Sequence, residues 1–330
     1  MNRIAIITSG GDAPGMNAVI RAIVFSCHEQ HIECFGFYHG YNGLINDEFI
    51  LLTPELVSPI IQRGGTILKS ARCKEMHQDA GVKQVANTLT KHKVDALIVI
   101  GGDGSFRGMM ALQNYWPGNL IGVPATIDND IACTDKTIGF ASAVNTATQA
   151  IDKIRDTANA FERVFIIEVM GRRSGHIAFN VGLAAGAEAI LSFENCNLKN
   201  LEQAKSHLIA QIQSQLVEQH TGFVIVLAEN LWPNGPHGLQ QALKDTANIE
   251  SAVCVLGYIQ RGGSPCPEDR ILATELGIEA VRAAKNSTGI MVGKVSGQIS
   301  RHCIIRATEQ NKPVDQALHS AYHHISKLNN

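Results

Sequence analysis

The sequence alternates short apolar runs with longer amphipathic segments over almost its whole length. The apolar runs are rich in β-branched residues, which is typical of strands buried on both faces of a sheet. A chain that repeats strand, loop and helix folds as a parallel sheet with helices on both sides. We expect strands at Ile4–Thr8, Ile32–Tyr38, Ala96–Ile100, Leu120–Val123, Val164–Val169, Phe223–Leu227 and Val253–Tyr258. We expect helices at Asn17–Glu29, Val82–His92, Thr137–Thr157, Leu201–Val217 and Asp269–Ala284.

The length of the chain, 330 residues, is sufficient for two sub-domains that share one cleft. No linker rich in proline, glycine or serine divides the chain, so we expect the sub-domains to be closely docked. The expected fold class is therefore α/β, with two docked three-layer sub-domains, mostly parallel sheets and an active site in the cleft between them. Ligands of such sheets bind at the carboxyl ends of strands, where this chain has glycine-rich loops.

Composition and charge argue against several other classes of protein. The formal net charge of -2 and the pI near 6.7 give no reason to expect nucleic acid or a membrane surface as a partner. The eight cysteines are scattered without a C-x-x-C pair, so we expect neither a disulfide framework nor a zinc site. The sequence contains no recognisable secretory signal and no apolar stretch long enough to span a bilayer, which predicts a cytoplasmic protein.

The first expected strand is followed by Gly10-Gly11-Asp12 and then by a helix. Paired glycines let backbone N–H groups approach an anion closely, and the start of a helix adds partial positive charge. A tight strand-to-helix turn would explain the same residues equally well. The loop matches neither the Walker-A pattern nor G-x-G-x-x-G, which argues against a dinucleotide oxidoreductase.

A second loop, Gly101-Gly102-Asp103-Gly104-Ser105, follows the strand expected at Ala96–Ile100. An acidic residue held among glycines suits Mg²⁺, which takes few carboxylates together with substrate phosphates. The alternative is that Asp103 only caps the following helix. Two such loops in one parallel sheet favour a nucleoside triphosphate with its metal.

The third loop, Thr126-Ile127-Asp128-Asn129-Asp130, places two carboxylates and a hydroxyl group at the end of a strand. Transfer of a phosphoryl group to an alcohol needs a group that accepts the hydroxyl proton, and an aspartate can do this. A second carboxylate can orient the first or raise its pKa. The alternative is an Asx-turn, in which these side chains only bond the backbone.

Two basic loops could neutralise phosphate charge. Arg172 and Arg173 follow Gly171 just past an expected strand, and Arg261 precedes the glycine pair Gly262-Gly263. Guanidinium groups bind phosphoryl oxygens well, although a single surface arginine is usually just solvated.

Together, these ordered motifs resemble those of bacterial ATP-dependent 6-phosphofructokinases over nearly the whole chain. The matching motifs are Ser9–Asn17, Gly64–Thr66, Ser70–Arg72, Gly101–Ser105, Thr126–Asp130, Val169–Arg172 and Gln260–Pro265. The resemblance implies a homotetramer and an ATP-binding sub-domain made of residues 1–139 plus 260–310. Residues 140–259 plus 311–330 would form the sugar-phosphate-binding sub-domain.

The resemblance also implies roles for individual residues. ATP would be held by Gly11, Arg72, Cys73, Gly102, Asp103, Gly104 and Ser105, with Mg²⁺ on Asp103. Asp128 would be the base toward the 1-hydroxyl of fructose 6-phosphate, and the other catalytic residues would be Thr126, Asp130, Arg172 and Gly11. The sugar phosphate would be contacted by Thr126, Ile127, Asp128, Arg163, Met170, Gly171, Arg172, Glu229, Tyr258 and Arg261. Arg163 would reach it from a neighbouring subunit.

Departures from the family pattern bear on the donor and the acceptor. Pyrophosphate-using relatives carry Asp at the position of Gly104 and Lys at the position of Ala125, so the resemblance favours ATP. Typical bacterial members have Arg where this chain has Ala252 and His where it has Tyr258. A lost charged hydrogen bond costs about 1.5–3 kcal/mol, so we expect a raised KM for fructose 6-phosphate or another acceptor such as sedoheptulose 7-phosphate.

The resemblance further suggests a weakened effector site. Arg21, Arg155 and Glu188 match family positions that bind ADP or phosphoenolpyruvate, but Phe25 and Pro54 replace two expected arginines. We therefore expect little allosteric response. Two other interpretations stay open, a non-catalytic nucleotide-binding paralogue with a regulatory role and, less consistent with the loops, a dinucleotide oxidoreductase.

Overall fold

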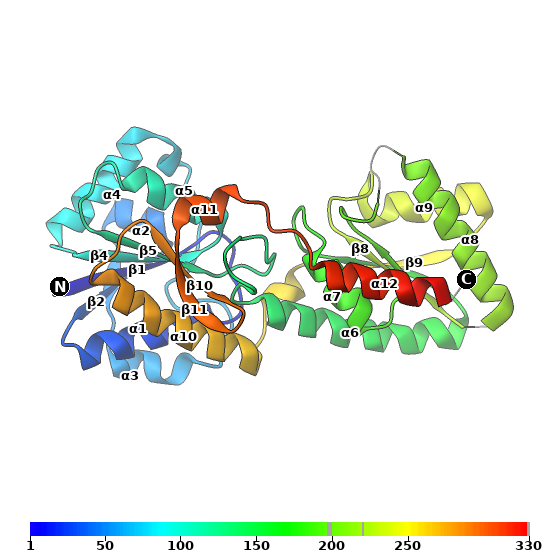
Figure 1. Ribbon diagram of the computed structural model, residues 1–330, viewed down its shortest axis with the longest axis horizontal. Coiled ribbons are helices and arrows are strands. Elements are labelled where there is room, and N and C mark those ends of the chain that lie inside the picture. The colour runs from blue at the N-terminus through cyan, green and yellow to red at the C-terminus, as the bar shows by residue number, and fades with distance from the viewer. Residues whose placement is uncertain (197–199, 220, 329–330) are drawn as a thin grey trace. The chain divides into compact units, whose positions relative to one another are not determined.

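The computed structural model describes residues 1–196, 200–219 and 221–328, and the chain divides into two compact units (Figure 1). Unit 1 comprises Met1–Ile127, Ile131–Ser142 and Arg261–Lys312. Unit 2 comprises Asp128–Asp130, Ala143–Gln260 and Pro313–Asn330. Each unit has its own sheet. The nucleotide and sugar-phosphate roles expected for the two sub-domains stay predictions.

Unit 1 is built on a seven-stranded sheet in the order β11-β10-β5-β4-β1-β2-β3. The five inner strands are parallel, and β3 and β11 are antiparallel at the two edges. All six residues of β4 are buried, as its continuous apolar run predicts. The strands are β1 (Arg3–Ser9), β2 (Glu33–Phe37), β3 (Phe49–Leu51), β4 (Ala96–Gly101), β5 (Asn119–Pro124), β10 (Ile290–Val295) and β11 (Gln298–Cys303).

Helices cover both faces of this sheet (Figure 1). On one face α1 and α10 pack closely together, because Gly277 of α10 has no side chain where a Cβ would lie 2.7 Å from the Cβ of Ala22. On the other face α4, α5 and α11 cover a core that includes Phe37 and Phe106. The helices of unit 1 are α1 (Met16–Glu29), α2 (Tyr41–Asn46), α3 (Pro54–Val57), η1 (Ser58–Ile60), η2 (Glu75–His77), α4 (Asp79–Lys91), α5 (Asp103–Leu112), α10 (Pro267–Ala284) and α11 (Ile304–Glu309).

Unit 2 is built on a four-stranded parallel sheet in the order β7-β8-β6-β9. Helices α8 and α9 contact each other, while α7 packs on β7 and β8 and contacts α12. The strands are β6 (Val164–Val169), β7 (Ala189–Leu191), β8 (Phe223–Ala228) and β9 (Ser251–Val255). The helices are α6 (Phe140–Phe161), whose first three residues belong to unit 1, α7 (His176–Ala184), α8 (Leu201–Gln219), α9 (Gly235–Ala247), η3 (Gly257–Arg261), whose last residue belongs to unit 1, and α12 (Gln316–Leu328).

The expected α/β class with mostly parallel sheets is confirmed, and most expected elements are present. Several boundaries were wrong, and helix α4, for example, begins at Asp79 rather than Val82. The last expected strand ends at Val255, because Gly257 adopts a φ of 51° and η3 follows. Helix α6 begins at Phe140 rather than Thr137 and extends to Phe161. The short strands β3, β7, β10 and β11 were not predicted.

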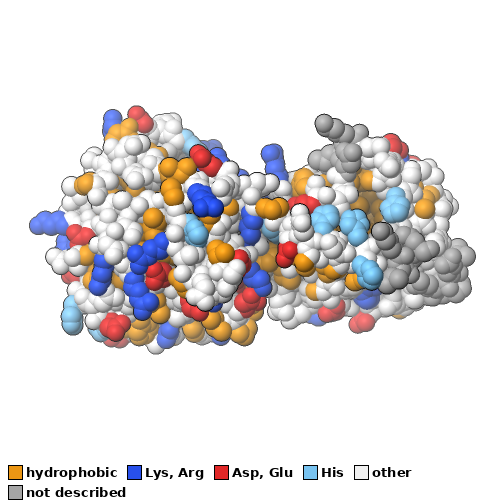
Figure 2. All heavy atoms as spheres, in the orientation of Figure 1, with side chains coloured by type: hydrophobic (Ala, Val, Ile, Leu, Met, Phe, Trp, Pro, Cys, Tyr) orange, Lys and Arg blue, Asp and Glu red, His pale blue; other side chains and the backbone are white. Residues whose placement is uncertain are grey.

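The distribution of charged side chains on the surface is consistent with the small net charge of the chain. On the face shown in Figure 2, basic and acidic side chains of unit 1 are interspersed rather than gathered into one basic patch. Within the described part of the chain, no helix is both long and apolar enough to cross a membrane.

Candidate functional site

Three of the predicted loops follow neighbouring strands in unit 1. The strands β5, β4 and β1 are adjacent, and their register pairs Ser9 with Gly101 and Gly101 with Pro124. Because parallel strands end at the same edge, the loops after Ser9, Gly101 and Pro124 leave the sheet side by side. The structure therefore brings together, within unit 1, the first loop, the second loop and the start of the third loop, Thr126–Ile127.

Side-chain hydroxyl groups hold the first two loops in place. The Oγ of Ser105 donates to the carbonyl of Ser9 at 2.9 Å, and the hydroxyl of Tyr41 donates to the carbonyl of Ser105 at 2.8 Å. The Oγ of Ser70 donates to the carbonyl of Gly10 at 2.7 Å. The segment that contains the predicted nucleotide contacts at 72 and 73 is thereby fixed beside the first loop.

The second loop opens helix α5. Gly102 is its N-cap and Asp103 its first residue, and one carboxylate oxygen of Asp103 lies 3.1 Å from the Nε of Arg107. A Cβ on Gly104 would meet no atom within 4 Å, so the protein's own packing does not require glycine there. No cluster of three His, Cys, Asp or Glu side chains suited to a metal occurs in the described ranges. A single carboxylate fits Mg²⁺ that takes its other ligands from phosphates and water.

Arg261 lies against the first loop. Its Nη1 donates to the carbonyl of Asp12 at 3.0 Å, and a Cβ on Gly11 would lie only 2.7 Å from this atom. A Cβ at position 11 would therefore require the end of the Arg261 side chain to shift. Arg72 is exposed. Burial raises the pKa of the Cys73 thiol, which is therefore a weak nucleophile at neutral pH.

The third loop is buried at its centre. The exposed fractions of Thr126 and Asp128 are 9% and 7%, and Ile127 is fully buried. The Oγ1 of Thr137 donates to the carbonyl of Thr126 at 2.6 Å within unit 1. The Oγ of Ser174 donates to the carbonyl of Asp128 at 3.2 Å within unit 2. The chain on both sides of Ile127 is therefore held by a hydroxyl group.

The loop after β6 has an unusual backbone that Glu229 stabilises. Gly171 has a φ of 140° and Arg172 a φ of 61°, a region that residues other than glycine rarely adopt. One carboxylate oxygen of Glu229 accepts hydrogen bonds from the N–H groups of Gly171 and Arg172, at 3.1 and 2.6 Å. Asn230 donates to the carbonyl of Arg172 at 3.0 Å. These bonds offset the conformational cost of the loop.

In unit 2 the structure brings the predicted guanidinium close to a predicted carboxylate. The Nη1 of Arg172 lies 3.9 Å from an Oδ atom of Asp130, and the side chain of Arg172 is 64% exposed. An exposed guanidinium at this distance is held loosely, so it is available to a more strongly charged group.

Three polar residues of the site were not predicted. Ser174 and Asn230 contact the third loop and the β6 loop as described. Gln260 is fully buried, and its Oε1 accepts a hydrogen bond from the N–H of Met170 at 3.4 Å. Gln260 lies inside a family motif, which was a signal for its importance. No sequence pattern distinguished Ser174 or Asn230.

Glu168 lies on β6, close to Glu229. Burial raises the pKa of Glu168, and the negative charge of Glu229 raises it further, while His237 acts in the opposite direction. The carboxyl end of the sheet in unit 2 thus has a carboxyl group that ionises less readily than an ordinary glutamate.

Other predicted acceptor residues are at the surface of the single chain. Tyr258 is 83% exposed, and Arg163 is exposed with its guanidinium 5.5 Å from the centre of the Phe161 ring. Ala252 lies in β9, at the edge of the sheet.

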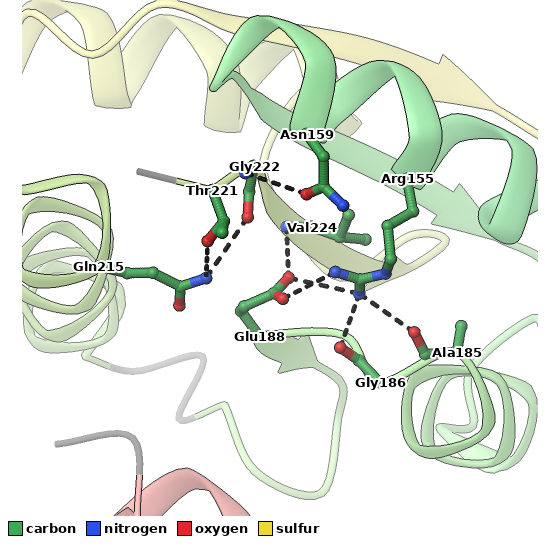
Figure 3. Close-up of polar contacts among 9 residues, drawn as sticks. All are labelled: Arg155, Asn159, Ala185, Gly186, Glu188, Gln215, Thr221, Gly222 and Val224. Carbon is green, nitrogen blue, oxygen red and sulfur yellow. Dashed lines mark hydrogen bonds and ion pairs between the residues drawn. The ribbon is translucent and has the colours of Figure 1, made fainter. Parts of the chain in front are cut away.

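The residues that match the family's effector positions in unit 2 bond one another (Figure 3). Arg155 forms an ion pair with Glu188 at 2.8 Å and donates to the carbonyls of Ala185 and Gly186 at 3.1 and 2.6 Å. The other oxygen of Glu188 accepts a hydrogen bond from the N–H of Val224 at 2.7 Å. The positive charge of Arg155 is therefore largely satisfied within the unit.

Comparisons with known proteins give one consistent result. A family model described as phosphofructokinase matches residues 3–284. ATP-dependent 6-phosphofructokinase 1 of Thermus thermophilus is 45% identical over 320 residues, which cover 96% of this chain and 97% of that protein. ATP-dependent 6-phosphofructokinase of Clostridium botulinum (strain Loch Maree) is 42% identical over 328 residues, 99% of this chain and 100% of that protein.

Solved structures of phosphofructokinases also match this chain. Phosphofructokinase from Saccharomyces cerevisiae matches with a TM-score of 0.87 and 31% identity over 100% of this chain, which spans 46% of the yeast chain. Pyrophosphate-dependent phosphofructokinase from Marinobacter aquaeolei matches with a TM-score of 0.81 over 96% of this chain and 86% of its own. At 22% identity, the second likeness shows a shared fold.

Proposed function

The chain belongs to the phosphofructokinase family, and on that premise we propose that it is a glycolytic enzyme that phosphorylates fructose 6-phosphate with ATP. The products are fructose 1,6-bisphosphate and ADP. The observation that carries the proposal is the buried Asp128, in a loop held by hydroxyl groups and followed two residues later by a carboxylate near Arg172.

In this proposal Asp128 accepts the proton of the sugar's 1-hydroxyl group. The hydroxyl oxygen forms a bond to the γ-phosphorus, and the bond between that phosphorus and the β–γ bridging oxygen breaks, which releases ADP. Arg172 neutralises the negative charge of the transferring phosphoryl group, with Thr126, Asp130 and Gly11 as the other catalytic residues. Because Arg172 contacts Asp130 only at a long distance, its guanidinium is able to move to the transferring phosphoryl group.

The donor site in this proposal is the set of loops at the carboxyl edge of β1 and β4, where Gly11, Arg72, Cys73 and Gly102–Ser105 hold ATP. Asp103 would hold Mg²⁺, which supplies charge neutralisation at the phosphates. The open space at Gly104 supports ATP, because a longer side chain there would compete with a nucleotide phosphate for that space.

The acceptor's phosphate is assigned to Arg163, Arg261 and Tyr258, with Met170, Gly171 and Glu229 near the sugar. Because Ala252 has no donor, we expect weaker binding of fructose 6-phosphate than is usual for the family. This observation favours one second candidate, a preference for a different sugar phosphate such as sedoheptulose 7-phosphate.

Self-association into a homotetramer is part of the proposal. It is supported by the exposed side chains of Phe161, Val255, Tyr258 and Ile259 in unit 2, at 65%, 52%, 83% and 54%. Val255, Tyr258 and Ile259 lie at and just after the end of edge strand β9, and apolar side chains exposed at such an edge are typical of interfaces between subunits. Arg163, which would act across this interface, is exposed beside the exposed ring of Phe161.

The test is an assay of purified protein with Mg²⁺, either ATP or pyrophosphate, and a panel of sugar phosphates. We expect ADP to form with ATP and fructose 6-phosphate, a raised KM for that sugar, and no turnover with pyrophosphate. A higher kcat/KM for sedoheptulose 7-phosphate would favour the second candidate. ATP binding without turnover of any sugar phosphate would identify a non-catalytic protein instead.

A further inference from the structure

Asp269 is a fully internal carboxylate that belongs to none of the predicted sites. It lies in the first turn of α10 and is 1% exposed. Its Oδ1 accepts a hydrogen bond from the N–H of Gly139 at 2.9 Å. Its Oδ2 accepts three more, from the N–H of Ser142 at 2.7 Å, from the Oγ of the same serine at 2.6 Å and from the Sγ of Cys266 at 3.7 Å. All these residues belong to unit 1.

These bonds give α6 the cap that its own sequence lacks. The helix begins at Phe140, so the N–H groups of Gly139 and Ser142 are among those that have no partner inside the helix. Gly139 has no side chain with which to cap them, and a Cβ there would lie 2.6 Å from the Cβ of Ala13. Asp269 supplies the missing acceptors from another helix, and its negative charge suits the start of a helix.

The capped segment is bonded directly to the start of the third loop. Thr137 donates its hydroxyl proton to the carbonyl of Thr126 at 2.6 Å, and the N–H of Ile138 donates to the carbonyl of Pro124 at 3.0 Å. Ile138 also forms a parallel bridge with Ala125. Movement of residues 137–139 would therefore move Thr126, two residues before the proposed base.

The same junction contacts the first loop. Gly15 is the N-cap of α1, and a Cβ there would lie 3.7 Å from the Cβ of Asp269. The close approach of Gly139 to Ala13 places the capped segment directly against the first loop. Asp269 thus lies where the start of α1, the start of α6 and the start of α10 meet.

We propose that Asp269 is a positioning residue for phosphoryl transfer, which sets the place of the start of the third loop, Thr126–Ile127, relative to the first loop by fixing residues 137–142. This inference rests on the proposed function. In-line transfer requires donor and acceptor oxygen atoms to be aligned closely, and a displacement of about 1 Å can cost on the order of 100-fold in rate. Asp269 would act through Thr137 and Thr126, without touching either substrate.

The first test is Asp269→Asn. The amide group keeps the size of the side chain but places an NH₂ group against an N–H donor, whichever way it is turned. We expect kcat to fall about 10- to 100-fold, with the KM for ATP changed less than about threefold. The matched control is Glu268→Gln, because Glu268 is the neighbouring carboxylate, exposed in an ion pair with Lys136, and we expect its kcat to stay within about twofold.

A second variant separates positioning from general destabilisation. Thr137→Val removes the hydroxyl that bonds Thr126 and keeps the side-chain shape. If Asp269 acts through this segment, the double variant will have a kcat close to that of the worse single variant. If the two residues contribute independently, the two fold-losses will multiply, and that result would overturn the proposal. The comparison stays valid if Asp269→Asn folds with a lower Tm, because kcat is measured per folded protein.

Amide hydrogen exchange supplies a readout that does not depend on activity. We expect Asp269→Asn to speed exchange in peptides that cover residues 124–131, with no change in peptides from β2. If the wild type is active and Asp269→Asn changes neither exchange in residues 124–131 nor kcat, the positioning role of Asp269 is refuted while the proposed function stands. If the wild type has no activity with ATP and fructose 6-phosphate, the proposed function fails, and the exchange result still decides whether Asp269 holds the loop.

Discussion

Glu229 illustrates how one side chain can organise a site at the level of single residues. Sequence resemblance assigns it a contact with the sugar, whereas one of its oxygens already bonds two backbone N–H groups of the β6 loop. The backbone positions of Gly171 and Arg172 depend on that oxygen. Replacing Glu229 would therefore disturb the place of Arg172 as well as any sugar contact, so it is a poor choice for measuring sugar binding alone.

Gly104 offers a sharper test of the phosphoryl donor. We expect Gly104→Asp to lower kcat/KM for ATP more than about tenfold, because the added carboxylate would repel a nucleotide phosphate. Gly104→Ala is the matched control. A Cβ at this position meets no atom within 4 Å, so the alanine variant should stay within a few-fold of wild type. Equal losses in both variants, measured by steady-state kinetics, would show that shape rather than charge matters there.

The raised pKa of Glu168 predicts that the stability of the fold depends on pH. Because burial and the charge of Glu229 raise its pKa in the folded protein, the native state binds more protons than the unfolded chain just above the ordinary glutamate value of 4.5. The free energy of unfolding should therefore decrease as pH rises through that window. Chemical denaturation of wild type and Glu168→Gln across this range should show a smaller decrease in the variant, and parallel curves would contradict the argument.

Among the secondary-structure elements, the sequence predicted most accurately the strands whose apolar runs are buried on both faces of a sheet. The central strands β1, β4, β5, β6 and β8 lie where their apolar runs indicated. The edge strand β11 was missed because its residues are exposed or half-buried and it has no continuous apolar run.

The limits of prediction for the site have the same physical origin. Glycine-rich loops and carboxylates at strand ends are local patterns, and they identified the first loop, the second loop and the third loop, whose first two residues lie beside the other loops in unit 1. The hydrogen-bond partners of Asp269 at the start of α6 are separated from it by 127 and 130 positions in the sequence, and the partner of Ser174 in the third loop by 46 positions. Such partners depend on how helices and loops pack, which a local pattern does not reveal.

Arg155, in the second half of helix α6, faces the turn before β7 (Figure 3). Because this arginine is bonded to Glu188 and two carbonyls, we expect ADP and phosphoenolpyruvate to have little effect on the rate. Saturation curves for fructose 6-phosphate should superimpose with and without each compound. A sigmoidal curve induced by phosphoenolpyruvate would contradict this expectation.

For the whole molecule, the exposed Tyr258 and Ile259 connect activity with assembly. We expect the double variant Tyr258→Ser, Ile259→Ser to dissociate at concentrations at which the wild type stays tetrameric, as measured by sedimentation velocity. If Arg163 acts across the interface, specific activity should fall as subunits separate. Exposed Ile271 of α10 in unit 1 is a matched control, and Ile271→Ser should leave the assembly unchanged.

The proposed reaction requires Asp128 to accept the proton of the acceptor hydroxyl, and kcat of Asp128→Asn with saturating ATP, Mg²⁺ and fructose 6-phosphate tests this requirement directly. An amide of the same size cannot take the proton, so kcat should fall about 10²- to 10⁴-fold while the affinity for ATP is unchanged. Asp152→Asn, an exposed aspartate on α6, should match wild type. A kcat of Asp128→Asn within about tenfold of wild type would contradict this requirement.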